Sequence, residues 1–313
     1  MSGRAVNVTI IGCGSVGASW AALFAAVGGH RVRAWDPTPD VRAALLEKVE
    51  AARQQLNELG AAKAGEVLVC DRIEEALWGA DWVQENAPEK VELKTQIYQH
   101  IESAVTHDCI IASSSSSFTW SQLGARLKHG ERFVIAHPFN PPHLVPVVEL
   151  FCPNLGVRDR AVKFFTDLGR VPVCMKKEAV GHIGNRLAAA LWREAVHLVA
   201  EGIVDVEDID KVLIHGPALR WSVMGAHLGY HIGGGEGGID HYLRHTGPGQ
   251  ERRWATLGNP KLTVELCETI AAGVHGEVDG RDTAELERQR DRQLIEIMKL
   301  RREHPTLDHK KPR

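Results

Sequence analysis

A histidine and a glutamate stand in a pattern that suits acid–base chemistry. The apolar run 133–136 leads into His137 and a proline-rich loop, and a second apolar run, 145–151, contains Glu149. A carboxylate among apolar residues needs a partner, and the short loop lets the second run fold back beside the first. We predict that His137 is a general base and that Glu149 orients it. The alternatives are a structural histidine and an edge-strand glutamate that faces water.

A second group of residues is typical of a dinucleotide-binding loop. Gly12, Gly14 and Gly17 form a Gly-x-Gly-x-x-Gly pattern between an apolar run and a helical pattern, and Asp36 follows 19 residues after Gly17. Such glycines allow a tight turn and a close approach of the pyrophosphate, while the acid suits the ribose hydroxyls. The alternative is a turn that only packs a helix on a strand. The predicted cofactor-binding residues are Gly12, Gly14, Ser15, Val16, Gly17 and Asp36.

Asp36 also discriminates between cofactors. Its negative charge would repel the 2′-phosphate of NADP, and residues 37–39 supply no adjacent cation. NAD is therefore the predicted cofactor. Arg33 and Arg42 lie near enough in the sequence to keep NADP open.

The first half of the chain alternates strand patterns with helix patterns. Strands are expected at 6–11, 30–35, 67–70, 82–85, 109–112 and 133–136, and helices at 18–27, 41–59 and 90–105. This order predicts an α/β fold with a Rossmann-type, doubly wound, mainly parallel sheet. His137 and the glycine loop would both follow strands, at the edge of the sheet where ligands bind.

The second half changes character. Helices are expected at 185–201, 206–214 and 283–302, with a glycine-rich loop at 233–238 and no evident strand. We predict an NAD-binding Rossmann domain over residues 1–183, and an all-helical domain for substrate binding and dimerisation over residues 184–313. The tail at 304–313 is expected to fray.

Composition excludes several classes of protein. The chain has 313 residues, 44% of them hydrophobic and 25% charged, which is typical of a globular protein. Its 37 basic residues do not exceed its 40 acidic ones, so nucleic acid is not an expected partner. The six cysteines form no Cys-x-x-Cys pair, which predicts a reduced protein without a metal site. With neither a signal-peptide pattern nor an apolar stretch of ~20 residues, we expect a cytoplasmic protein that does not enter membranes.

Motifs along almost the whole chain resemble the 3-hydroxyacyl-CoA dehydrogenase superfamily, and they occur in its order. They are residues 12–17, 85–89 with Lys94, 113–117, 137–141, Glu149 and 181–187. The resemblance implies NAD-dependent oxidation of a 3-hydroxyl group, with His137 as the base and Glu149 as its orienter. It also implies that Ser116 and Asn185 bind the reacting oxygen. Glu89 and Lys94 would line the nicotinamide side of the cofactor.

The chemistry of these side chains is compatible with the implied roles. A hydroxyl and an amide both donate hydrogen bonds to a developing alkoxide or carbonyl oxygen. The alternative for the serine run is a polar loop in which Ser116 initiates a helix. His182 stands where the superfamily usually has an aromatic or aliphatic residue, and its role is left open.

Within this superfamily, the second half is most similar to carnitine 3-dehydrogenases, with L-gulonate 3-dehydrogenase, the lambda-crystallin relative, next. The segments that carry this similarity are 191–195, 219–225, 233–235 and 284–288. The resemblance implies a small 3-hydroxy acid substrate, with L-carnitine oxidised to 3-dehydrocarnitine as the leading candidate. Alternatives are gulonate, a 3-hydroxyacyl-CoA, for which no suitable basic cluster is evident, and a non-catalytic, crystallin-like protein that binds NAD.

A quaternary ammonium substrate needs aromatic faces, because it cannot donate a hydrogen bond. Aromatic candidates are Phe139, Trp192, Trp221 and Tyr230, and candidate cations for the substrate carboxylate are Arg193 and Arg220. The alternatives are core packing for the rings and solvent exposure for the arginines.

A homodimer is expected through the helical half. Leu198, Val199, Ile203 and the apolar residues of 206–214 form surface that a helical domain of this size buries poorly alone. The alternative is that they pack against the first half of the same chain.

Overall fold

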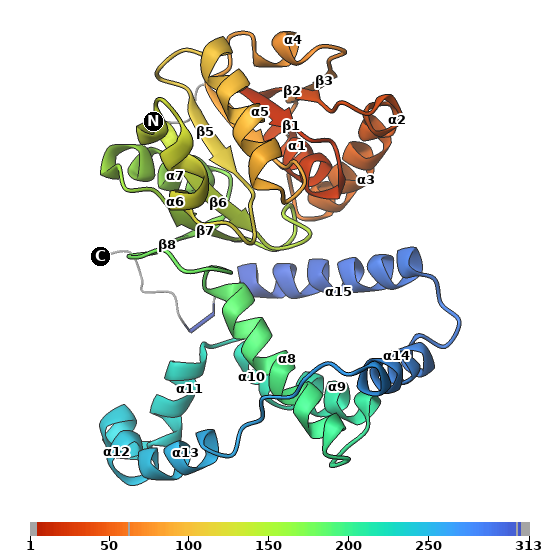
Figure 1. The fold of residues 1–313 in the computed structure, drawn as a ribbon, viewed down its shortest axis with the longest axis vertical. Coiled ribbons are helices and arrows are strands. Elements are labelled where there is room, and N and C mark those ends of the chain that lie inside the picture. The colour runs from red at the N-terminus through yellow and green to blue at the C-terminus, as the bar shows by residue number, and fades with distance from the viewer. Residues whose placement is uncertain (1–4, 62, 305, 308–313) are drawn as a thin grey trace. The chain divides into compact units, whose positions relative to one another are not determined.

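The computed structural model describes residues 5–61, 63–304, 306 and 307 (Figure 1). The chain forms two compact units, Met1–Arg186 (unit 1) and Leu187–Arg313 (unit 2). The expectation of a frayed tail falls mostly on residues 305 and 308–313, which lie outside the described residues.

Unit 1 contains one eight-stranded sheet, in the order β3-β2-β1-β4-β5-β6-β7-β8. All neighbouring strands are parallel except β6 and β7, which are antiparallel. The strands are β1 (Asn7–Ile11), β2 (Arg31–Trp35), β3 (Glu66–Val69), β4 (Trp82–Glu85), β5 (Ile110–Ser113), β6 (Phe133–Pro138), β7 (Val147–Phe151) and β8 (Val171–Cys174). The predicted Rossmann-type sheet is confirmed.

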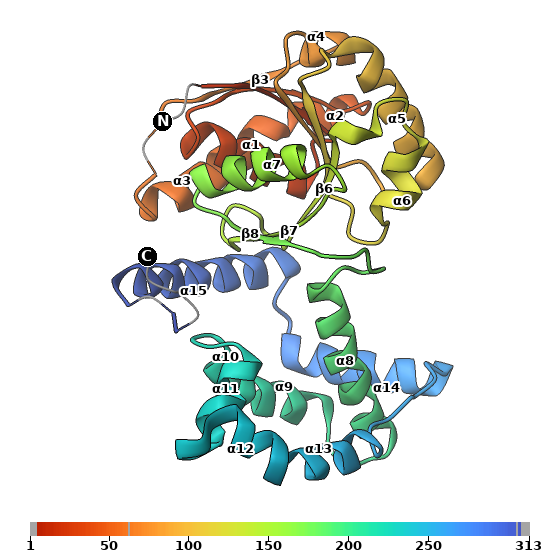
Figure 2. The same ribbon diagram turned by 90° about the vertical axis from the view of Figure 1, so that its left-hand side faces the viewer.

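Helices cover both faces of this sheet. They are α1 (Ser15–Ala26), α2 (Pro39–Ala43), α3 (Leu45–Glu58), α4 (Ile73–Leu77), α5 (Val91–Ala104), α6 (Trp120–Leu123) and α7 (Leu155–Asp167), with 3₁₀ turns η1 (Gly124–Arg126) and η2 (Gly130–Arg132). Figure 2 shows α3 and α7 on one side of the sheet and α5 and α6 on the other. The single helix expected at 41–59 is two helices: α2 begins at Pro39 and ends at Ala43, and α3 begins at Leu45.

Two hydrophobic cores result from the alternation of side chains along the strands. Ile10 packs with α1, α3 and α7, whereas the next residue, Ile11, packs with α4, α5 and α6. Helix α1 is buried nearly all round, and its Trp20 stacks on Phe24 at 5.2 Å. The strands that carry the candidate site are therefore held rigidly from both faces.

Unit 2 is entirely helical in its described part, as predicted. Its helices are α8 (Gly184–Ala200, starting in unit 1), α9 (Val206–His215), α10 (Pro217–Trp221), α11 (Ala226–Gly233), α12 (Gly238–His245), α13 (Gly247–Trp254), α14 (Val264–Val278) and α15 (Thr283–Glu303), with a 3₁₀ turn η3 (Gly235–Gly237). Helix α12 packs on α11 and α13, and α9 packs on α10 and α14. None of the described helices in either unit combines the length and apolar composition needed to span a bilayer.

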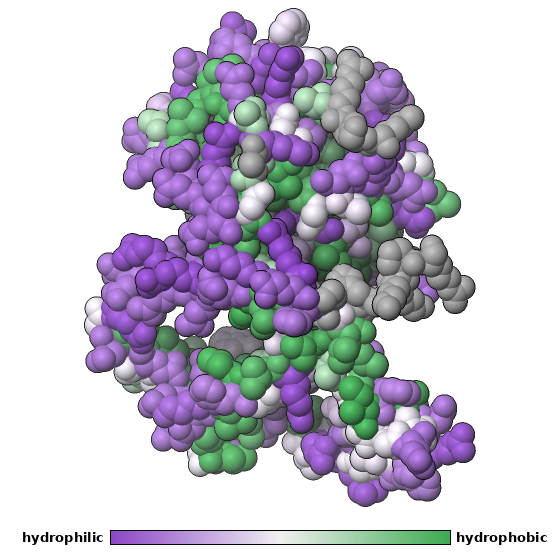
Figure 3. Space-filling model, turned by 180° about the vertical axis from the view of Figure 1, so that it is seen from behind, coloured by the Kyte–Doolittle hydropathy of each residue, from purple (hydrophilic) through white to green (hydrophobic). Residues whose placement is uncertain are grey.

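Unit 2 buries few of its own apolar side chains. Among its described residues, the only buried hydrophobic side chains are Val196 and Ile295. Large apolar residues on α8 to α15 are exposed instead, and Figure 3 shows such side chains on the surface of the helical unit. Unit 2 thus lacks the core that unit 1 has.

Candidate active site

The loop between β1 and α1 has the geometry that a pyrophosphate needs. Gly12 has a φ of +92°, and a Cβ there would lie 2.8 Å from the Asn86 carbonyl oxygen. A Cβ at Gly17 would lie 1.9 Å from the Gly12 oxygen, so α1 approaches the loop as closely as possible. At Gly14, by contrast, a Cβ would meet no atom within 4 Å, and no side chain caps the start of α1. This open space beside a helix N-terminus fits a phosphate group.

Asp36 lies directly after β2 and supports the same loop. Its Oδ2 accepts a hydrogen bond from the Cys13 N–H at 2.9 Å, and its Oδ1 accepts one from the Thr38 N–H at 2.9 Å. A carboxylate has about four acceptor positions, so Asp36 can still accept from ribose hydroxyls. The site residues therefore fit NAD.

The two arginines near Asp36 both have protein partners. Arg42 donates to the Asp36 carbonyl oxygen at 2.7 Å and pairs with Asp71 at 3.6 Å. Arg33 donates to the Trp78 carbonyl oxygen and lies 5.2 Å from the centre of its ring. These contacts agree with NAD rather than NADP, because an NADP site needs a cation for the 2′-phosphate.

His137 and Glu149 lie directly opposite each other on the antiparallel strands β6 and β7. Their Nδ1 and Oε2 atoms are 2.8 Å apart, and both side chains are buried. The other carboxylate oxygen accepts hydrogen bonds from the N–H groups of Ile183, at 2.8 Å, and Gly184, at 2.9 Å. Burial raises the pKa of Glu149, but the bonds from His137, Gly184 and Ile183 outweigh it and lower the pKa below its ordinary value. The glutamate is therefore a firm carboxylate partner for the imidazole.

The serine loop after β5 converges on Glu89. The Ser115 hydroxyl donates to the Glu89 carboxylate at 3.0 and 3.1 Å, and the Ser116 hydroxyl donates at 3.0 Å. The Ser116 N–H also donates to Glu89, and the Asn185 amide donates to the Ser116 carbonyl oxygen at 3.3 Å. The structure thus brings Ser116, Asn185 and Glu89 together, with the Ser116 hydroxyl bonded to Glu89.

Lys94 belongs to a buried polar cluster that the sequence analysis missed. Its Nζ contacts Glu85 at 2.7 Å and the Ala87 carbonyl oxygen at 2.9 Å. The second oxygen of Glu85 accepts from the hydroxyls of Tyr98 and Ser113. Burial and the negative charge of Glu85 raise the pKa of Tyr98, which stays a neutral donor. The available signal was Glu85 itself, a carboxylate at the end of an apolar run, just as Glu149 is.

A cavity of about 200 Å³ joins these groups within unit 1. It is lined by Val16, Asn86, Ala87, Glu89, Lys94, Ser114, Ser116, His137, Pro138 and Asn140. Ser15, the first residue of α1, is exposed. Burial raises the pKa of Glu89, but the charge of Lys94, at 3.7 Å, and the hydrogen bonds from Ser115 and Ser116 outweigh this effect. The pKa of Glu89 is therefore lowered, and the group is a carboxylate at neutral pH. The cavity therefore carries a negative group on one side and the imidazole on another.

His182 lies beside the imidazole of His137, with the ring centres 5.0 Å apart. It has a φ of +51° and is buried, and its Nε2 donates to the Ser115 carbonyl oxygen at 3.0 Å. Its Nδ1 is buried without a hydrogen-bond partner. Burial lowers the pKa of His182, so this ring is neutral. Phe139 lies on the same side of the site, 5.2 Å from His137.

The predicted substrate residues of the second half lie on three helices of unit 2. Trp192 and Arg193 are on α8, Arg220 and Trp221 end α10, and Tyr230 is on α11. All five side chains are exposed, so the three rings are not core residues. The ring of Tyr230 packs against that of Tyr242 at 4.9 Å, a partner that the sequence analysis did not identify.

Comparison with known proteins agrees with this geometry. Residues 7–179 match the family model of the 3-hydroxyacyl-CoA dehydrogenase NAD binding domain, and residues 181–275 match that of the 3-hydroxyacyl-CoA dehydrogenase C-terminal domain. The L-carnitine dehydrogenase of Nocardiopsis dassonvillei is 42% identical over 93% of this chain and 90% of its own length. That of Pseudomonas aeruginosa is 36% identical over 94% and 93%.

A solved structure shares the architecture as well. The crystal structure of 5-formyl-3-hydroxy-2-methylpyridine 4-carboxylic acid 5-dehydrogenase, an NAD⁺-dependent dismutase, superposes with a TM-score of 0.83. It is 28% identical and covers 95% of this chain and 98% of its own. With both family models matched in order over most of its length, the chain belongs to the 3-hydroxyacyl-CoA dehydrogenase family and is an NAD-dependent dehydrogenase.

Proposed function

We propose that this protein oxidises L-carnitine to 3-dehydrocarnitine with NAD. The observation that carries the proposal is the buried His137–Glu149 pair, which opens on a cavity that also contains Ser116 and Glu89. Relatives that are 36–42% identical over nearly the whole chain bear the name L-carnitine dehydrogenase, which supports this substrate.

His137 acts as the general base in this proposal. Its Nδ1–H donates to the carboxylate of Glu149, so the neutral imidazole carries its lone pair on Nε2. Nε2 takes the proton of the 3-hydroxyl group, and Glu149 stabilises the imidazolium that forms. The bound NAD supplies the acceptor for the hydride that leaves the same carbon.

Ser116 and Asn185 hold the reacting oxygen. The Asn185 amide has two N–H groups, and only one is needed for the Ser116 carbonyl oxygen. The Ser116 hydroxyl bonds to Glu89, and rotation about one side-chain bond turns its proton toward a substrate oxygen. Glu89 then keeps the Ser115 hydroxyl and two backbone N–H groups as partners.

Glu89 and Lys94 line the nicotinamide side of the cofactor. Lys94 has three N–H donors, and Glu85, Ala87 and Glu89 all lie within its reach. It is therefore a positioning residue that holds Glu89 in place, rather than a free cation for the substrate.

The exposed residues of unit 2 bind the two ends of carnitine. The faces of Trp192, Trp221 and Tyr230 suit its trimethylammonium group, since a cation held over an aromatic ring gains about 0.5–2 kcal/mol. Arg193 and Arg220 are each adjacent in sequence to one of these tryptophans and suit the carboxylate. Phe139, beside His137, supplies apolar surface near the reacting carbon.

The division of labour follows the two units. Residues 1–183 bind NAD and residues 184–313 bind substrate and form a homodimer, because unit 2 leaves most of its apolar side chains exposed. A cytoplasmic location is supported by the six cysteines, all of which are free thiols.

A substrate panel tests the activity. Purified protein with NAD is offered L-carnitine, L-gulonate and 3-hydroxybutyryl-CoA, and NADH absorbance is followed. We expect carnitine to give the highest kcat/KM. A higher value with gulonate or the CoA ester would refute the proposed substrate, and no NADH with any of the three would favour a non-catalytic protein.

Tryptophan variants test the substrate-binding residues. Loss of one ring in Trp192→Ala or Trp221→Ala should raise the KM for carnitine roughly 2- to 30-fold, with NAD binding unchanged. Trp254→Ala is the matched control, because this ring is also exposed in unit 2 but has no assigned role. Equal KM values in all three variants would remove the aromatic residues from the site.

Sedimentation tests the assembly. We expect a particle of about twice the chain mass at micromolar concentration, since dimer formation covers the exposed apolar surface of unit 2. A particle of 34.4 kDa would end the dimer proposal.

A further inference from the structure

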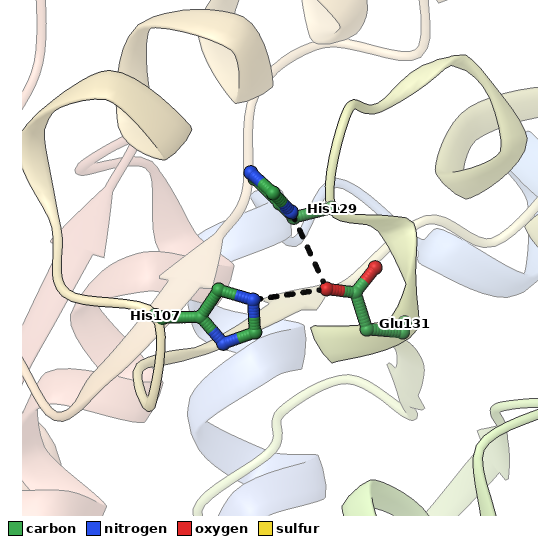
Figure 4. Close-up of side chains that lie close together, drawn as sticks. All are labelled: His107, His129 and Glu131. Atoms are coloured by element: carbon green, nitrogen blue, oxygen red, sulfur yellow. Dashed lines mark ion pairs between the residues drawn. The ribbon is translucent and has the colours of Figure 1, made fainter.

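Three side chains with metal-binding atoms converge on the surface of unit 1. They are His107, in the turn between α5 and β5, His129, just before η2, and Glu131, within η2 (Figure 4). His107 Nε2 lies 3.2 Å from Glu131 Oε1, and His129 Nδ1 lies 3.4 Å from the same oxygen. All three ligand atoms lie within 4.8 Å of one another.

The two histidine–glutamate separations are close to those between ligand atoms in the coordination sphere of zinc. In a tetrahedral site with bonds of about 2.0–2.1 Å, neighbouring ligand atoms lie about 3.3–3.4 Å apart. The two imidazole rings are 5.1 Å apart and inclined at 67°, so both nitrogens face the carboxylate oxygen without stacking of the rings. Two imidazoles and one carboxylate favour a borderline metal such as Zn²⁺ over Mg²⁺ or Ca²⁺, which prefer oxygen ligands alone.

Four hydrogen bonds, three of them partly buried, hold the two segments that carry these ligands. Arg132, which follows Glu131, is buried and donates to the carbonyl oxygens of Thr106 and Glu102. The Glu102 carboxylate accepts from the Lys128 N–H at 3.1 Å and from the His129 N–H at 2.7 Å. The backbone positions of the ligands are therefore set before any ion binds, and Glu102 adds negative charge beneath the loop.

The cluster lies at the opposite edge of the sheet from the candidate active site. It precedes β5 and β6, at the amino ends of these parallel strands, whereas the serine loop and His137 lie at their carboxyl ends. An ion at the cluster would join the turn after α5 to η2 without contact with the reacting groups.

We propose that His107, His129 and Glu131 form a peripheral site that binds one Zn²⁺ per chain, with water in the fourth position. The sequence gives no signal for it, because 21 residues lie between the two histidines and the ligand set contains no cysteine. The bound ion cross-links two surface turns and stabilises unit 1.

Calorimetric titration with ZnCl₂ tests the site. The protein is untagged and carries Cys267→Ser, because Cys267 is exposed and a thiolate is itself a zinc ligand. We expect one equivalent to bind, and each of His107→Ala, His129→Ala and Glu131→Gln to weaken binding at least about tenfold. The thermal unfolding temperature should rise with zinc in the parent protein and not in these variants. Unchanged NAD-dependent turnover without zinc shows that the variants fold.

Two matched controls exclude other histidines. His100 pairs with Glu74 at 3.5 Å, and no described residue adds a third ligand. His241 and His245 face each other on α12 with ring centres 4.4 Å apart. We expect His100→Ala and His241→Ala to bind zinc as the parent does. Loss of binding in either control, or binding unchanged in the three ligand variants, would overturn the proposal. An absence of stoichiometric binding in the parent would do so as well.

Discussion

Unit 1 and unit 2 differ in how many of their side chains they bury. Unit 1 encloses two hydrophobic cores and also buries charged groups, such as Lys94 with Glu85 and His137 with Glu149. The described part of unit 2 buries only Val196 and Ile295 among its hydrophobic side chains. The candidate catalytic pair thus lies in the unit that has cores of its own, whereas many large apolar side chains in the described part of unit 2 are exposed.

The largest expected effect comes from removal of the base in unit 1. His137→Gln should lower kcat roughly 10²- to 10⁴-fold, because the substrate hydroxyl loses its proton acceptor. The NAD dissociation constant and the sedimentation coefficient should stay unchanged, since neither cofactor binding nor unit 2 depends on this imidazole. Turnover reduced by less than tenfold would contradict the role of His137. A change in the sedimentation coefficient would show that a substitution in unit 1 affects assembly, which we assign to unit 2.

The same substitution in the two units should have very different effects on stability. Lys94→Met leaves Glu85 as an unpaired buried charge and should lower the free energy of unfolding by about 3–5 kcal/mol. Lys211→Met is the control in unit 2, where the lysine is 56% exposed beside Glu207 and water replaces the lost ion pair. Chemical denaturation measures both variants, and equal losses would refute the contrast between the units.

Dilution should affect unit 2 and spare unit 1. If dimer formation buries the exposed helices, each tenfold dilution lowers the stability of the bound form by about 1.4 kcal/mol. Hydrogen exchange at several protein concentrations should therefore show protection that falls with dilution in α8 to α15 alone. Protection independent of concentration in both units would indicate that unit 2 is stable without a partner copy.

Acid should lower the stability of unit 1 in two steps, each smaller than the effects predicted above. Burial holds the pKa of His182 below 6.5, so below pH 6.5 the unfolded chain binds a proton that the folded chain does not, and stability falls. The pKa of Glu149 lies below 4.5, because hydrogen bonds outweigh the effect of burial, so a second loss follows below pH 4.5.

Variants assign these steps in denaturation curves measured across pH. His182→Phe should reduce the first loss, to which His30 also contributes, and Glu149→Gln should reduce the second, to which Glu89 also contributes. If His182→Phe leaves the profile between pH 6.5 and 4.5 unchanged, the neutral buried state of this histidine is wrong.

Most of unit 1 could be predicted from the sequence, because its strands are apolar runs between glycines and polar turns. Strand β8 was missed, since Val171–Cys174 is short, half exposed and contains Pro172. In unit 2, helices α10 to α14 were not predicted, because glycines and short helices such as Pro217–Trp221 interrupt the helical pattern. There the periodic apolar signal of a self-contained core is largely absent.

The candidate site divides in the same way. The proximity of His137 and Glu149 could be inferred from the length of one loop, because the two residues are close in sequence. The place of His182 could not, since its hydrogen bond to Ser115 joins segments that are distant in the sequence. The pairing of Lys94 with Glu85 is local, and Glu85, at the end of an apolar run, was a signal for it that went unused. The sequence shows which residues are charged, but the folded structure is needed to show which donors bind the same carboxylate.

The start of helix α8 contributes to the charge state of Glu149. Its first residue, Gly184, donates an N–H to Glu149, as does Ile183 just before it, and the helix continues to Ala200 in unit 2. If these two donors moved away from the carboxylate, the pKa of Glu149 would rise, because its charged form would lose two hydrogen bonds. The carboxylate would then stabilise the imidazolium of His137 less well. The charge beside the imidazole therefore depends on where α8 begins, a position fixed by residues that touch neither substrate nor cofactor in the proposed reaction.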